Sequence, residues 1–209
     1  MKLVAPDERW AGSNGTEGLS LSFSLSPPRH TPRFINSLMI PPNIASRYSL
    51  STSTSLPFPS STQSKGDAQK TIVQQWSVNQ GRIQQGAENI AFVSDPFPEH
   101  QLASSASFPS PSGPVLRVTY PQGGFGSSDS GVQFYSSWNS TGAPFKSILL
   151  TYEVAFDLTF DWVRGGKLPG LRGGPDPNSC EGGSQSDGTC FSTRVMWRKS
   201  GDGEGTWVG

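Results

Sequence analysis

Residues 191–198 read FSTRVMWR, and apolar and polar side chains alternate along this run. Successive residues of a β-strand point to opposite faces of its sheet, so the alternation predicts a strand. Its polar face would carry Ser192, Arg194 and Arg198. A hydroxyl group beside two guanidinium groups suits the binding of an anionic ligand.

A lysine lies shortly before this strand. Residues 165–174 read GGKLPGLRGG, so Lys167 stands between glycine-rich segments. A lysine in such a setting is usually a solvated turn residue. Its nearness in sequence to a cationic strand gives it a second interpretation, as part of a site for an acidic sugar polymer.

Further alternating or β-branched runs precede the motif, separated by glycine and proline turns. They are residues 115–120, 131–135 and 147–158. Residues 68–78, AQKTIVQQWSV, fit a short helix or a first strand equally well. With no convincing helical repeat elsewhere, the pattern predicts an all-β fold, an antiparallel β-sandwich.

The first third of the chain has a different texture. Residues 1–66 are rich in Ser, Pro and Thr. Hydrophobic residues make up 33% of the whole chain, against a usual ~45–50% in a tally that also counts glycine. We predict a disordered segment over residues 1–66 and a domain over residues 67–209. Low-complexity disorder or a misassigned start of the gene is preferred over an organelle transit peptide.

Charge and hydropathy exclude some classes. Lys and Arg number 16, as do Asp and Glu, so the net charge is +0. This balance argues against broad, non-specific nucleic-acid binding. No apolar run approaches the ~18 residues of a membrane span. Asp7, Glu8 and Arg9 interrupt any apolar core of a secretory signal, so no export signal is predicted.

The two cysteines are Cys180 and Cys190, on either side of a glycine-rich loop. A disulfide across this loop would contribute roughly 2.5–3 kcal/mol. Two unrelated thiols are the alternative. A zinc site is disfavoured because no CxxC spacing occurs, and His30 and His100 lie far away in sequence. We predict no metal site.

Taken together, FDWVRGGKLPGLRGG (residues 160–174) and CFSTRVMWR (residues 190–198), preceded by VLRVTYPQG, GVQFY and TYEVAFD, resemble the polysaccharide lyase family 14 domain of alginate and related glucuronan lyases. The likeness spans roughly Gln69 to Glu204 and is greatest to secreted fungal members. It implies a β-jelly roll whose concave sheet binds a uronate polymer. It also implies β-elimination without a cofactor, and secretion.

The resemblance assigns roles to individual residues. Lys167, Ser192 and Arg194 match the family's catalytic lysine, serine and arginine. Arg194 would pair with the uronate carboxylate, and Ser192 would donate a hydrogen bond to the sugar. Lys167 would be a base or, as we favour, a group that neutralises charge. Gln133 and Arg198 are predicted to bind substrate.

These roles follow the chemistry of β-elimination. Removing the C5 proton of a uronate builds negative charge on the neighbouring carboxylate, which cationic and hydrogen-bonding groups stabilise. A base takes the proton, and an acid protonates the leaving oxygen.

One part of the family pattern is missing. In these lyases a GxGE turn leads to a strand with tyrosines, one of which transfers a proton. Here the turn is residues 201–204, and Thr206 and Val208 stand at the approximate tyrosine positions. We therefore predict an incomplete jelly roll with doubtful activity. The alternatives are a non-catalytic protein that binds acidic carbohydrate and a non-functional fragment. Which uronate polymer is bound and the oligomeric state stay open.

Overall fold

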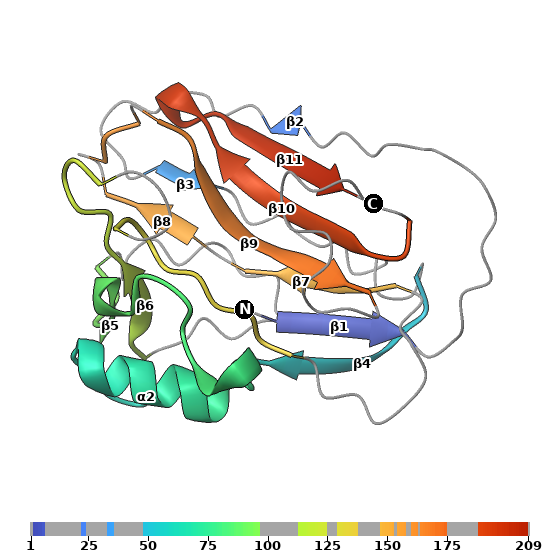
Figure 1. Ribbon diagram of the computed structural model, residues 1–209, viewed down its shortest axis with the longest axis horizontal. Coiled ribbons are helices and arrows are strands. Elements are labelled where there is room, and N and C mark those ends of the chain that lie inside the picture. Colours follow the sequence, from blue (N-terminus) through green and yellow to red (C-terminus); the bar gives the residue numbers. More distant parts are fainter. Residues whose placement is uncertain are drawn as a thin grey trace. The chain divides into compact units, whose positions relative to one another are not determined.

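The structure is a computed structural model (Figure 1). It describes residues 2–6, 22–23, 33–35, 48–96, 113–124, 129–137, 147–152, 154–157, 160–162, 164–174 and 188–208. The chain forms two compact units. One is Thr54–Ala143, and the other combines Met1–Ser53 with Pro144–Gly209. We refer to them as the helical unit and the sheet unit.

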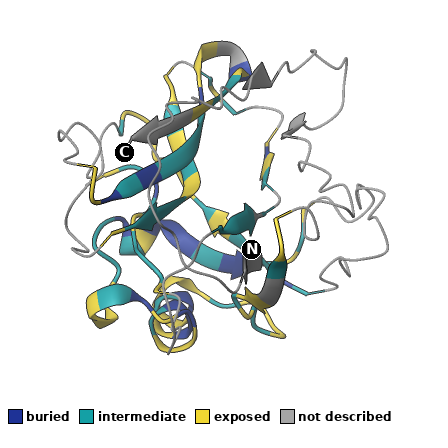
Figure 2. Cartoon of the chain, turned by 90° about the vertical axis from the view of Figure 1, so that its right-hand side faces the viewer, coloured by how far each residue is buried: buried dark blue, intermediate teal, exposed yellow. Residues whose placement is uncertain are grey.

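The helical unit is built around helix α2, Lys65–Gln75. Ala68, Thr71 and Ile72 are buried along it, at the i, i+3, i+4 spacing that gives a helix one apolar side. Figure 2 shows buried residues on one side of this helix and exposed ones on the other. Asp67 lies in the first turn, where a negative charge is favourable. Of the two structures that fit residues 68–78 in the sequence, a helix or a first strand, the helix is the one that forms, up to Gln75.

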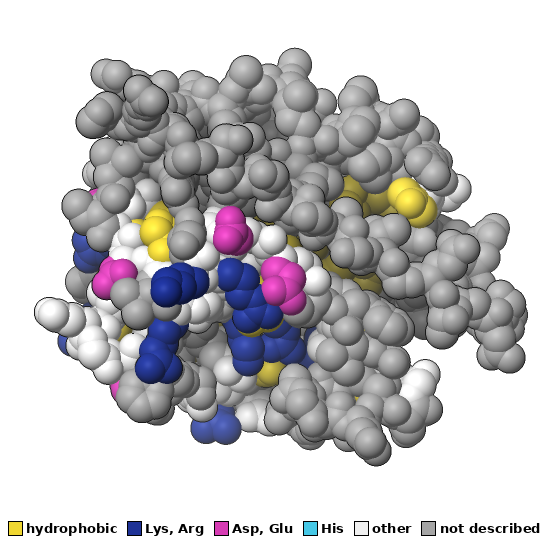
Figure 3. All heavy atoms as spheres, turned by 90° about the horizontal axis from the view of Figure 1, so that it is seen from above, with side chains coloured by type: hydrophobic (Ala, Val, Ile, Leu, Met, Phe, Trp, Pro, Cys, Tyr) yellow, Lys and Arg dark blue, Asp and Glu magenta, His cyan; other side chains and the backbone are white. Residues whose placement is uncertain are grey.

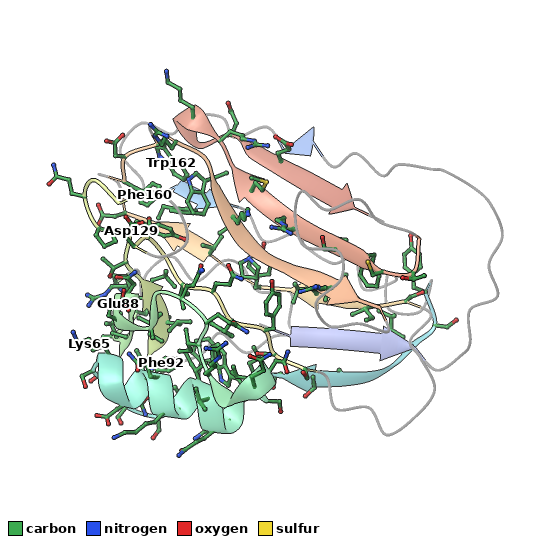
Figure 4. All side chains as sticks on the ribbon, in the orientation of Figure 1. Lys65, Glu88, Phe92, Asp129, Phe160 and Trp162 are labelled. Carbon is green, nitrogen blue, oxygen red and sulfur yellow. The ribbon has the colours of Figure 1, made fainter. Side chains whose placement is uncertain are left out.

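An aromatic core lies against this helix. The ring of Trp76 is 5.5 Å from that of Phe58, 6.0 Å from that of Phe92 and 5.9 Å from that of Phe134. Its indole N–H donates a 2.6 Å hydrogen bond to the carbonyl of Pro57. Figure 4 labels Phe92, which is 1% exposed. These contacts give the helical unit a hydrophobic core of its own.

Strands and short helices complete the helical unit. Strand β5, Ile90–Val93, pairs antiparallel with β6, Val115–Val118, which lies in the predicted strand over residues 115–120. Two 3₁₀ helices, η1 (Asn79–Gly81) and η2 (Ala87–Asn89), lie between α2 and β5. Residues 131–135, a predicted strand, make only isolated bridges, such as the one between Gln85 and Gln133.

The predicted disorder does not extend to the residues just before α2. Leu56 and Phe58 pack against the core of the helical unit, and Gln63 pairs with Phe92. Two apolar side chains in a proline-rich stretch are enough to hold it, because the core is next to it in sequence. The predicted domain boundary at residue 67 falls inside this unit.

The sheet unit has at its centre a sheet in the order β2-β11-β10-β9. The four strands are β2 (Ser22–Phe23), β9 (Gly166–Gly173), β10 (Phe191–Trp197) and β11 (Gly203–Val208). The predicted strand over residues 191–198 is thus β10, and it lies between two partners. The glycine-bracketed lysine lies in strand β9 instead of a turn.

The other strands of this unit form two smaller sheets. Strand β1 (Lys2–Pro6) lies between β4 (Leu50–Ser55) and β7 (Leu149–Thr151), and β3 (Arg33–Ile35) pairs with β8 (Val154–Phe156). The predicted strand over residues 147–158 is thus split in two. Among the described residues, most elements are strands, and every pairing with a described register is antiparallel. The predicted all-β class is confirmed, with α2 added.

Candidate functional site

The register of β9 and β10 brings the motif residues to one face of the sheet. Lys167 pairs with Met196, Gly170 with Arg194, and Arg172 with Ser192. Paired residues of antiparallel strands project their side chains from the same face. Lys167 and Arg194 are therefore diagonal neighbours on this face, at the ~7–8 Å separation typical of such pairs.

A β-bulge interrupts the ladder between these positions. From Lys167 to Gly170, β9 advances three residues, whereas β10 advances two between Met196 and Arg194. Gly170 approaches the carbonyl of Thr193 so closely that a Cβ atom there would overlap it. Only glycine fits a strand at such a close backbone approach.

A tyrosine supports the bulge from outside the ladder. The hydroxyl of Tyr152 donates a 3.1 Å hydrogen bond to the carbonyl of Pro169. Burial raises the pKa of Tyr152, so its hydroxyl stays protonated and remains a donor. The contact gives a partner to a carbonyl in the bulged segment of β9.

The opposite face of β9 and β10 packs into an aromatic cluster. The ring of Trp197 lies against Gly166, leaving no room for a side chain there. It is 5.4 Å from the ring of Phe156 and 5.9 Å from that of Phe160, and Trp162 joins the same cluster (Figure 4). Trp197 is 3% exposed, so it is a core residue and not a stacking surface for sugars. The sheet thus has one apolar face and one that carries the motif cations.

The motif side chains differ in their burial. Lys167 is exposed and Arg194 is half-buried. Ser192, expected on a wet face, is only 5% exposed, and its Oγ has no hydrogen-bond partner in the described part of the chain. A buried hydroxyl without a partner costs ~1–3 kcal/mol. Such a group is uncommon in native structures and calls for a reason.

Arg198, just after β10, is already paired. Its Nε donates a 2.6 Å hydrogen bond to Oε2 of Glu204, and both side chains are exposed. This hydrogen bond raises the pKa of Arg198 and lowers the pKa of Glu204. Figure 3 shows a face on which Lys and Arg side chains gather beside Asp and Glu side chains.

Residues 109–206 match the family model of polysaccharide lyase 14. This part of the chain is similar to that family. The recognition made from the two motifs is thereby confirmed, and a polysaccharide is the substrate class of a polysaccharide lyase. Comparison with curated proteins and with solved structures gave no match.

The roles assigned to individual residues all remain predictions. Gln133 belongs to the helical unit, where its exposed side chain donates a 3.5 Å hydrogen bond to the hydroxyl of Tyr135. Cys190 is buried, and Cys180 lies outside the described residues. The substrate-binding role of Gln133 and the disulfide stay untested.

Strand β11 lies next to the motif strand and carries Thr206 and Val208, which stand at the approximate positions of the expected tyrosines. Thr206 pairs with Arg194, and Val208 pairs with Ser192. The residues at the approximate tyrosine positions therefore lie directly across from the predicted catalytic arginine and serine. A valine cannot transfer a proton, and a threonine hydroxyl is a much weaker acid than a phenol.

Sequence reasoning missed Arg172, which lies across from Ser192 on the motif face. Nothing in its sequence neighbourhood marks it, because the alternation of β9 is interrupted by the bulge. Within the described residues, no group of three or more His, Cys, Asp or Glu could hold a metal ion. None of the described helices is long and apolar enough to cross a membrane.

Proposed function

We propose that this protein binds a uronate-containing polysaccharide on the face of β9 and β10 that carries Lys167, Ser192 and Arg194, and cleaves it slowly by β-elimination. The observation that supports this most is the register that makes Lys167 and Arg194 neighbours on one face. The family match over residues 109–206 supports a polysaccharide as ligand. Action outside the cell and a Cys180–Cys190 bridge are parts of the same proposal.

The geometry favours a charge-neutralising role for Lys167. A lysine serves as a base when burial destabilises its charged form, but Lys167 is exposed. Two cations on one face stabilise the negative charge that develops on a uronate carboxylate after loss of the C5 proton. Arg194, with its planar fork of N–H donors, is the group suited to hold the carboxylate with two hydrogen bonds.

Slow cleavage follows from β11. With Thr206 across from Arg194 and Val208 across from Ser192, this strand supplies no phenol for proton transfer at these two positions. Loss of a general acid or base typically lowers a rate ~10²–10⁴-fold. Binding is affected much less, because the cationic side chains are retained.

The test compares binding and cleavage in the same preparations. Affinity for alginate and for polyglucuronate is measured by calorimetry, and cleavage by far-ultraviolet absorbance of the unsaturated product. Lys167→Ala and Arg194→Ala should weaken binding, while Arg117→Ala, which removes an exposed cation from the helical unit, should not. Binding that survives both motif substitutions would overturn the proposal.

A second experiment asks why cleavage is slow. Thr206→Tyr should raise the elimination rate, whereas Thr206→Phe, which adds the ring without the hydroxyl, should not. Val208→Tyr and Val208→Phe form the matching pair. If neither tyrosine raises the rate while polymer binding is intact, the protein is a non-catalytic binder of acidic carbohydrate. That is the second candidate function, and it is favoured by the same Thr206 and Val208.

A further inference from the structure

We propose that Arg172 binds a second carboxylate of the same polymer, so that the cationic face of β9 and β10 binds two charged sugars and not one. This inference rests on the proposed function. It adds a specificity-determining residue to the site, and it names the ligand more closely as a chain of successive uronates. Its basis is the placement of Arg172, Ser192, Arg194 and Lys167 by the register of β9 and β10.

The bulge is what brings Arg172 to this face. Lys167 and Arg172 are five residues apart, and in a regular strand an odd separation places side chains on opposite faces. The extra residue of the bulge changes this alternation. Lys167 pairs with Met196 and Arg172 with Ser192, and these two partners are four residues apart on β10. Both cations of β9 therefore share the face of Arg194.

Arg194 lies between the two cations of β9. Gly170, which has no side chain, is its direct partner on β9, and Lys167 and Arg172 are its diagonal neighbours on either side. From the Met196 position to the Ser192 position the strand rises ~13 Å at 3.3 Å a residue. This length exceeds one sugar ring, so a single uronate cannot reach both ends of the row.

Ser192 gives independent support for a ligand at the Arg172 end. Its hydroxyl is buried and has no hydrogen-bond partner in the described part of the chain. It lies in register with Arg172 on the same face. A carboxylate or hydroxyl of a sugar held by Arg172 would supply the partner that this oxygen lacks. A buried polar group without a partner calls for an explanation, and a bound ligand would supply one.

The test uses the whole chain and uronate oligomers of increasing length. Affinities for a disaccharide and a hexasaccharide of glucuronate and of mannuronate are measured by calorimetry for the wild type, Arg172→Ala and Arg172→Lys. We expect Arg172→Ala to weaken hexasaccharide binding about tenfold or more, as for loss of a charge-assisted hydrogen bond. Disaccharide binding should change less, because Lys167 and Arg194 remain. Arg172→Lys should lie between, since it keeps the charge and loses the planar fork.

The controls separate this inference from the proposed function. Arg117→Ala removes one exposed cation elsewhere and should leave both affinities unchanged. Thermal unfolding of each variant identifies those that fail to fold, and Arg172→Lys then carries the test. If Arg172→Ala and Arg172→Lys bind the hexasaccharide as the wild type does while Arg194→Ala does not, the second site is wrong and the proposed function stands. If the folded wild type binds no uronate oligomer, both are overturned.

Discussion

The two compact units differ in the hydrogen bonding of their buried polar side chains. In the helical unit, the hydroxyl of Thr71 donates a 2.7 Å hydrogen bond to Oε1 of Gln63, and Nδ2 of Asn89 donates one of 2.9 Å to the carbonyl of Gly131. In the sheet unit, Ser192 is buried to a similar degree and its hydroxyl has no partner among the described residues. Thr71 and Asn89 thus have partners within their own unit, whereas Ser192 has none in the described part of the sheet unit.

This difference in hydrogen bonding holds for polar residues whose whole side chain is buried. The helical unit also has buried side-chain oxygens without a partner, but these belong to half-buried residues: Gln84, Gln85 and Ser136. A buried hydroxyl without a partner, such as that of Ser192 beside the cations, lowers stability. The comparison singles out Ser192 as the position at which the proposed ligand would supply a missing partner.

The largest expected effect is in the core of the helical unit. Trp76→Ala should lower the free energy of unfolding by about 3–5 kcal/mol, because it removes a buried ring and leaves a cavity. The change also removes the indole hydrogen bond to Pro57. Urea denaturation measures it. Tyr48→Ala, at a side chain that is 52% exposed, is the control and should change little. A loss below about 1 kcal/mol for Trp76→Ala would contradict a packing role.

The next effect is at the bulge. Gly170→Ala should lower the free energy of unfolding by about 1–3 kcal/mol, since its methyl group would overlap the carbonyl of Thr193 and push the strands apart. It should also weaken polyuronate binding, because the bulge sets the positions of Lys167 and Arg172. Gly66→Ala in α2 is the matched control, because nothing lies within 4 Å of an added Cβ there. That change should raise stability by up to about 1 kcal/mol. Equal outcomes for the two glycines would argue against the bulge.

A pair of substitutions tests the comparison itself. Ser192→Ala removes a hydroxyl without a partner and should raise the free energy of unfolding by up to about 1 kcal/mol while weakening polyuronate binding. Thr71→Val removes a hydroxyl that has a partner and should lower stability by about 1 kcal/mol. Thermal unfolding and calorimetry measure the two properties. A loss of stability in both variants would erase the distinction between the units.

The smallest effect concerns the Arg198–Glu204 ion pair. Glu204→Gln should strengthen polyuronate binding a few-fold, because Arg198 is then no longer neutralised, and Arg198→Ala should change binding little. The carboxyl of Glu204 has a pKa below its ordinary value of 4.5, so the ion pair persists at neutral pH and is lost as pH falls through that lowered pKa. An NMR titration of Glu204 in the wild type and in Arg198→Ala checks the sign. The pKa should rise in the variant, and no change would mean that the pair is not formed in solution.

The sequence predicts the parts of the fold in which periodicity and burial agree. The alternation of residues 191–198 predicts β10, and the run over residues 115–120 predicts β6. Helix α2 could not be assigned, because β-branched residues and helical spacing occur together in it. Phe58 stands between two prolines, which indicate a loop but do not prevent its ring from packing against Trp76.

For the site, the sequence identifies the residue types but not the face of the sheet on which each side chain lies. Lys167, Ser192 and Arg194 were found through the family motifs, and the register of β9 and β10 places them on one face. Arg172 was missed because a bulge is a property of two strands together. Its signature in a single sequence is only a glycine in an otherwise regular run.

The bulge also decides which kinds of mutation this segment can accept. Replacing the side chain at position 167 or 172 changes the chemistry of the face and leaves the ladder as it is. Deleting a single residue between them would remove the bulge and leave both cations on one face, four residues apart, but the extra bend and twist that the bulge gives the strand would be lost. Over evolutionary time, new sugar preferences should therefore arise here by replacement of amino acids, while the length of this strand is conserved.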